Sequence, residues 1–106
     1  MKSRFISIHS TAGDEKTARA IAGILVSERL AACVQVEGPL LSVYRWKGAV
    51  ENAEEWRMVI KTRASLFDRV VRRIRENHPY EVPEIVAFPV ADGSKDYLDW
   101  IDDSTN

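Results

Sequence analysis

The fold is decided by the stretch Glu54-Glu55-Trp56-Arg57-Met58-Val59-Ile60-Lys61-Thr62, in which apolar and polar side chains alternate. Successive side chains of a β-strand point to opposite faces, so a period of two predicts a strand. The apolar face of this strand carries Trp56, Met58 and Ile60, and the opposite face carries Arg57, Val59 and Lys61.

A second strand precedes this one and is predicted from Val34 to Trp46. Gly38-Pro39 interrupts it and predicts a bulge or bend, because proline cannot donate to a strand ladder. Beyond the bend, one face carries Leu40, Ser42, Tyr44 and Trp46, and the other carries Leu41, Val43 and Arg45. Residues Lys47 to Ala53 are predicted to connect the two strands into a hairpin.

The remaining elements flank this hairpin on both sides. On the N-terminal side, the pattern predicts a strand from Arg4 to Ser10 and a helix from Glu15 to Leu30 that Asp14 caps. On the C-terminal side, the second helix begins at a cap formed by Ser65 with Asp68 and stops by His78, since the following proline disfavours helical geometry there. A fourth strand from Glu84 to Val90 and a short helix capped by Ser94 complete the chain.

The order of these elements predicts an α+β fold of the ferredoxin-like βαββαβ type, an antiparallel sheet with both helices on one face, plus a short C-terminal helix. The length suits a single domain that spans residues 1–106. The other face of the sheet carries Tyr44, Trp46 and Val59, and an uncovered aromatic face predicts a partner subunit.

Composition narrows the classes of function. Lys and Arg number 15 against 16 Asp and Glu, and this balance favours neither nucleic acid nor an anionic membrane as a partner. The lone Cys33 excludes an intramolecular disulfide and favours a cytoplasmic location. The apolar part of the N-terminus is too short for a signal peptide, and no run approaches membrane-spanning length.

Catalytic and RNA-binding signatures are also missing from the sequence. The strand from Glu54 to Thr62 lacks the glycine and aromatic pattern of an RNA-binding module of this topology. Cys33, the obvious thiol nucleophile, lies in an Ala-Ala-Cys-Val segment that is typical of buried packing. The sequence therefore predicts a protein that is not an enzyme, with a small hydrolase as a minor alternative.

Four stretches together resemble the CutA family of divalent-cation tolerance proteins. They are His78-Pro79-Tyr80-Glu81-Val82-Pro83-Glu84-Ile85, Leu30-Ala31-Ala32-Cys33-Val34, Ser42-Val43-Tyr44-Arg45-Trp46-Lys47-Gly48 and Tyr97-Leu98-Asp99-Trp100. The resemblance implies a homotrimer of ferredoxin-like subunits whose edge strands pair between neighbours, similar in architecture to the PII signalling proteins. It also implies binding of copper and other divalent cations and a contribution to tolerance of them.

His78 and Glu84 are the candidate copper ligands, because copper prefers imidazole and thiolate and accepts carboxylate. A fully extended run between them would span roughly 20 Å, so they share one ion only if the prolines fold the segment back or a neighbour contributes. Some family members have cysteine where this chain has Ser10 and histidine where it has Asn77. Weak copper binding is therefore predicted, with His9 as a substitute ligand; alternatively, His78 and Glu84 only cap the helix and order a turn.

The competing hypothesis is a PII-like sensor that binds a small ligand, for example an anion, in a cleft between subunits. Residues Lys61, Arg63, Tyr80, Trp46 and Glu84 would line that cleft, since cations beside aromatic rings suit such ligands. The residues assigned to a ligand cleft or an interface are Trp46, Lys61, Tyr80 and Trp100. Interface packing is the alternative role for Trp46 and Tyr80.

Overall fold

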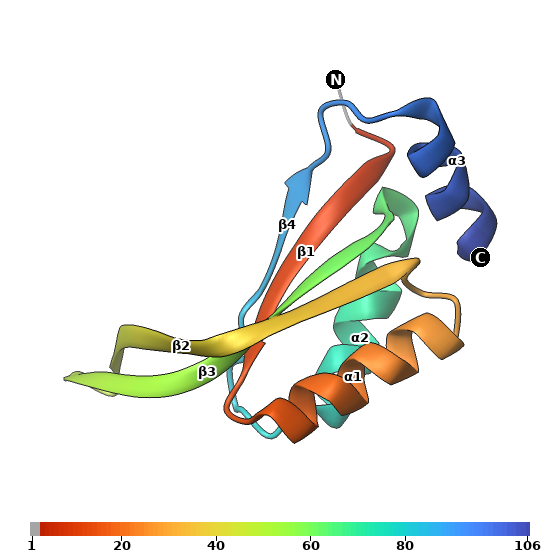
Figure 1. The fold of residues 1–106 in the computed structure, drawn as a ribbon. Coiled ribbons are helices and arrows are strands. Elements are labelled where there is room, and N and C mark those ends of the chain that lie inside the picture. Colours follow the sequence, from red (N-terminus) through yellow and green to blue (C-terminus); the bar gives the residue numbers. More distant parts are fainter. Residues whose placement is uncertain (1–2) are drawn as a thin grey trace.

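The computed structural model describes residues 3–106, so Met1 and Lys2 of the predicted domain lie outside the described residues. Its elements are β1 (Phe5–Ala12), α1 (Glu15–Ser27), β2 (Cys33–Trp46), β3 (Ala49–Arg63), a 3₁₀ turn (Ala64–Leu66), α2 (Phe67–Asn77), β4 (Ile85–Pro89) and α3 (Lys95–Ser104). The strands form one antiparallel sheet in the order β2-β3-β1-β4. Helices α1 and α2 lie on one face of it (Figure 1), which confirms the ferredoxin-like prediction.

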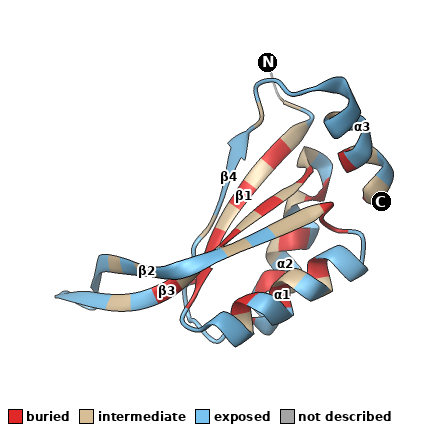
Figure 2. Ribbon diagram, in the orientation of Figure 1, coloured by how far each residue is buried: buried red, intermediate tan, exposed pale blue. Residues whose placement is uncertain are grey.

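The core lies between the sheet and the two helices (Figure 2). Pairing of β1 with β3 sets Ile8 opposite Ile60 and Ser10 opposite Met58, and all four side chains are fully buried. Buried positions of the helices face them, namely Ala18, Ile21 and Leu25 of α1 and Val70 and Ile74 of α2. Burial of each large aliphatic side chain stabilises the fold by about 1.5–3 kcal/mol.

The β2–β3 hairpin is longer than its sequence predicted. The connection is only Lys47 and Gly48, with φ of 49° and 82°, as in the type I′ turns that match the twist of two-residue hairpins. The predicted connection from Lys47 to Ala53 is therefore wrong, and Ala49 to Ala53 belong to β3. The predicted bulge at Gly38-Pro39 is confirmed by a register shift between Glu37 and Leu40. The distal part of the hairpin projects beyond the helices (Figure 1).

Helix α1 ends at Ser27, three residues before the predicted end. Leu30 N–H donates to the carbonyl of Leu25 and Arg29 N–H donates to that of Val26, which is a Schellman motif with Arg29 in the left-handed position at φ of 60°. Its N-terminus is as predicted, because the Asp14 carboxylate accepts from the N–H of Thr17 at 2.7 Å.

The other two helices begin without side-chain caps. Ser65 lies inside the 3₁₀ turn, so it does not cap α2, whose N-cap is Leu66. Ser94 is at the N-cap of α3 as predicted, but its side chain makes no capping hydrogen bond. Within residues 3–106, no helix combines the length and apolar character needed to cross a membrane.

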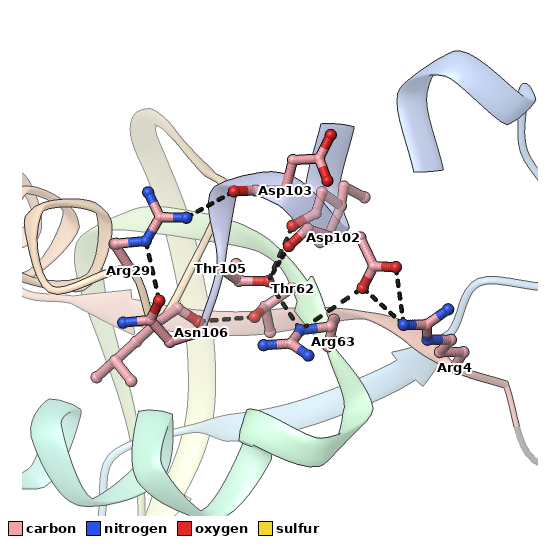
Figure 3. A network of polar contacts seen from close by, with 10 residues as sticks. Arg4, Arg29, Thr62, Arg63, Asp102, Asp103, Thr105 and Asn106 are labelled. Carbon is pink, nitrogen blue, oxygen red and sulfur yellow. Dashed lines mark hydrogen bonds and ion pairs between the residues drawn. The ribbon is translucent and has the colours of Figure 1, made fainter. Parts of the chain in front are cut away.

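A polar network fixes α3 and the residues after it to the rest of the fold (Figure 3). Arg4 pairs with Asp102 at 2.7 Å, and Arg63 donates to the Thr105 hydroxyl at 2.9 Å. Arg29 donates to the side-chain oxygen of Asn106 at 3.0 Å, while the Asn106 N–H donates to the carbonyl of Arg29. The two bonds between Arg29 and Asn106 connect the residues after α3 to the left-handed residue that follows α1.

Two buried hydroxyls provide a matched test of this core. The Ser10 hydroxyl has no hydrogen-bond partner among residues 3–106, whereas the Thr62 hydroxyl donates to the carbonyl of Leu30 at 2.7 Å. Ser10→Ala should leave the free energy of unfolding unchanged or raise it by about 1 kcal/mol, because it removes an unsatisfied polar group. Thr62→Val should lower it by about 1 kcal/mol. Urea unfolding at equal chain concentration measures both, and equal losses in the two variants would contradict the assignment.

Candidate functional site

A cleft of about 610 Å³ opens between the hairpin and the segment that follows α2. Its lining comes from the end of β1, from both strands of the hairpin and from this segment: Thr11, Ser42, Val43, Tyr44, Trp46, Glu55, Tyr80, Glu81, Val82, Pro83 and Glu84. Cross-strand pairing sets Leu40 opposite Glu55 and Tyr44 opposite Glu51. Because alternate residues share a face, Glu55 therefore lies on the same side of the hairpin as Tyr44 and Trp46.

His78 holds the wall of the cleft in place. The Tyr80 N–H donates to Nδ1 of His78 at 3.1 Å, so Nε2 carries the proton and donates to the carbonyl of Thr11 at 2.7 Å. The His78 side chain is buried, and its ring lies 4.7 Å from that of Tyr80. Both ring nitrogens are thus engaged: Nε2 joins the segment after α2 to the end of β1, and Nδ1 orders the segment itself.

Tyr80 and Glu55 connect that segment to the hairpin. The Tyr80 hydroxyl donates to Oε2 of Glu55 at 2.9 Å, and only 7% of Glu55 is exposed. Gly13 permits this approach, because a Cβ at that position would lie 2.9 Å from the Tyr80 hydroxyl. Partial burial, followed by the bond to the Glu55 carboxylate, raises the pKa of Tyr80 to about 12. The phenol therefore remains a donor at neutral pH.

The predicted metal ligands do not form a chelating set within one chain. Glu84 is exposed on the cleft wall, while His78 uses both nitrogens in hydrogen bonds. Ser10 is fully buried, and the Asn77 amide donates to the carbonyl of Arg73. Residues 3–106 contain no group of three His, Cys, Asp or Glu side chains placed to hold a metal ion. A single chain therefore does not fit a resident metal.

The residues assigned to a cleft or interface separate into two groups. Trp46, Tyr80 and Glu84 all line the cleft. Lys61 lies on β3 beside Gln35, at 3.5 Å, and Trp100 stacks near Tyr97 on α3 with ring centroids 5.5 Å apart; neither lines the cleft. Their proposed role at an interface stays a prediction.

Sequence reasoning missed Glu55, the most buried acidic side chain of the cleft. A usable signal was present. Glu55 shares its face of the strand with Arg57 and Val59, and a two-residue turn at Lys47-Gly48 would have set it opposite Leu40, on the same face of the hairpin as Tyr44 and Trp46. The missing information was the length of that turn.

Comparison with known proteins gives consistent matches over the chain. Residues 6–104 match the family model described as CutA1 divalent ion tolerance protein. A "Divalent-cation tolerance protein CutA" from Thermus thermophilus is 46% identical over 95 residues, which cover 90% of this chain and 92% of that protein. A solved structure from the same organism, a divalent cation tolerance protein (Cut A1), has a TM-score of 0.94 at 43% identity and covers 96% of this chain and 99% of its own.

A plant relative is longer than this chain. "Protein CutA 1, chloroplastic" from Oryza sativa subsp. japonica is 39% identical over 100 residues, which cover 94% of this chain and 56% of that protein. The chain thus spans about half the length of this relative.

The Tyr80–Glu55 bond can be tested by titration. Tyr80 should ionise near pH 12, later than free tyrosine near pH 10. Between these values the folded state holds the proton more tightly than the unfolded state. The stabilisation is therefore complete below about pH 10 and is lost as the pH rises through about 12. Ultraviolet absorbance should show a tyrosinate step near pH 12 that Tyr80→Phe removes, and because burial also raises the pKa of Tyr97, Tyr97→Phe is the control. An unchanged step near pH 12 in the Tyr80 variant would disprove the assignment.

Proposed function

The chain belongs to the CutA1 divalent ion tolerance family, and on that basis we propose that it is a divalent-cation tolerance protein that acts as a homotrimer without enzymatic activity. It binds copper and other divalent cations weakly, and it works in the cytoplasm without nucleic-acid or membrane partners. The family match over residues 6–104 carries this proposal. The near-neutral net charge of −1 supports the proposed lack of nucleic-acid and membrane partners, and the lone Cys33 supports a cytoplasmic location.

Exposed apolar strands support association between copies. Strands β2 and β4 are the two edges of the sheet, with no neighbour on their outer sides among the described residues. Leu41, Val43 and Val50 on the hairpin are more than half exposed, and Val86 and Phe88 of β4 are also exposed. Open edges with exposed apolar side chains are unfavourable in water, so pairing with neighbouring copies would stabilise them.

The side-chain contacts support weak binding of copper. His78 can serve as a ligand only by giving up one of its two hydrogen bonds, and Glu84 is the predicted ligand that is exposed. Further ligands would have to come from a second copy or from solvent. Each of these requirements lowers affinity relative to a preformed site.

A PII-like sensor is the second candidate, and the 610 Å³ cleft favours it, since this volume suits a small molecule. Lys61 and Arg63, which suggested an anionic ligand, lie outside the lining. Arg63 instead donates to Thr105. The ligand of such a sensor would therefore meet carboxylates and aromatic rings.

Light scattering tests the homotrimer. The expected mass is three times the 12.0 kDa of one chain. Val43→Lys places a charge on the exposed hairpin and should shift the population toward smaller species, because an apolar contact would then bury an unpaired charge. Lys16→Ala, on the exposed surface of α1, is the control. A monomer at all concentrations would eliminate both candidate functions.

Copper titration tests the cation site. His78→Ala and Glu84→Ala should each weaken binding about tenfold or more, since even the loss of an outer-shell partner typically costs that much. His9→Ala is the variant to compare with His78→Ala, because the His9 ring packs on Phe88 at 4.6 Å, away from the cleft lining. Calorimetry on the assembled protein gives the affinities. Unchanged affinity in both the His78 and Glu84 variants would remove these residues from the site.

A further inference from the structure

Glu55 is a buried carboxylate that lacks a cationic partner. Only 7% of the residue is exposed, and none of the ion pairs formed within residues 3–106 includes it. Tyr80 donates to Oε2, while Oε1 has no hydrogen bond within the same residues. Within residues 3–106 the Ser10 hydroxyl is the one fully buried side-chain polar atom without a partner, so Oε1 of Glu55 is accessible from the cleft and can meet a cation there.

The cleft that surrounds Glu55 has aromatic walls and an acidic rim. Tyr44, Trp46 and Tyr80 contribute rings, and the exposed Glu81 and Glu84 lie on the wall formed by the segment after α2. Lys, Arg and His are all absent from its lining among the described residues. The Trp46 ring lies farther along the hairpin, where Nζ of Lys47 already lies 5.6 Å from its centroid.

From these features we infer that the cleft binds a small organic cation of the alkylammonium class, with Glu55 as counter-ion and the rings of Tyr44 and Tyr80 as walls. The volume of about 610 Å³ is far larger than a bare ion requires and lies within the range of small-molecule pockets. A divalent metal ion would instead need several converging ligands, which residues 3–106 do not assemble. Aromatic faces with a single carboxylate are the usual surroundings of alkylated ammonium groups.

The inference is tested with choline and its neutral isostere 3,3-dimethyl-1-butanol, which has the same shape without the charge. Titration of the assembled protein, followed by nuclear magnetic resonance shifts of the tyrosine side chains, should show saturable binding of choline and binding of the alcohol weaker by about tenfold or more. Glu55→Gln should weaken choline binding about tenfold or more, because the counter-ion is lost while a carbonyl remains to accept from Tyr80.

Glu54→Gln is the matched control. It removes the same charge from the adjacent residue, which is exposed on the opposite face of β3, and should leave choline affinity unchanged. Tyr44→Leu should weaken choline binding roughly threefold or more through loss of the ring face. Equal binding of choline and the alcohol, equal effects of the two glutamate variants, or the absence of saturable choline binding would each overturn the inference.

These outcomes are separate from those of the copper titration. The choline experiment depends on Glu55 and Tyr44, whereas copper binding is proposed to depend on His78 and Glu84. The cleft can therefore fail as an organic-cation site while the tolerance function stands, and the reverse also holds.

Discussion

Side-chain alternation along β3 is the constraint on which the other parts of the molecule depend. This strand pairs with β1 on one side and with β2 on the other, so its register sets both neighbours. Met58 and Ile60 enter the core, while Glu55 and Lys61 fall on the opposite face. A slip of one residue would bury a lysine and expose two core side chains, at a cost of several kcal/mol. The same register that closes the core therefore delivers Glu55 to the cleft.

The segment after α2 becomes one wall of the cleft through two hydrogen-bonded links. His78 attaches it to the end of β1, and Tyr80 attaches it to the hairpin through Glu55. The His78 imidazole therefore has a structural role, and the side chains available to contact a ligand in the cleft include carboxylates and aromatic rings. Among residues 3–106 the cleft lining therefore consists of carboxylates, aromatic rings and uncharged side chains, without an imidazole.

Periodicity predicted the fold well because most elements have one apolar face. The order of elements, the Asp14 cap, the bulge at Gly38-Pro39 and the end of α2 at Asn77 all follow from local chemistry. The predicted end of α1 is wrong at a point where tertiary contacts accompany an unusual backbone conformation. Arg29 adopts a left-handed conformation that usually requires glycine, and its bonds to Asn106 and Asp103 accompany that strain.

The candidate site was predicted less completely, and the reason is again physical. Trp46, Tyr80 and Glu84 were identified, but Glu55 depends on the two-residue turn. Lys47 adopts positive φ there without being glycine or asparagine, so Gly48 alone marked the turn. The hydrogen bonds of His78 depend on how the chain folds back onto β1, which no pattern within the segment encodes.

The projecting hairpin has a consequence for cooperativity. Beyond the bulge, its two strands pair only with each other, and the nearby helices do not cover them (Figure 1). An isolated two-stranded ribbon is marginally stable in water, so the tip of a lone chain would open far more readily than the helix-backed sheet. Contacts with another copy would add that missing stabilisation. If the chains associate as proposed, order at the tip and self-association are thermodynamically linked, so conditions that favour assembly would also order the tip.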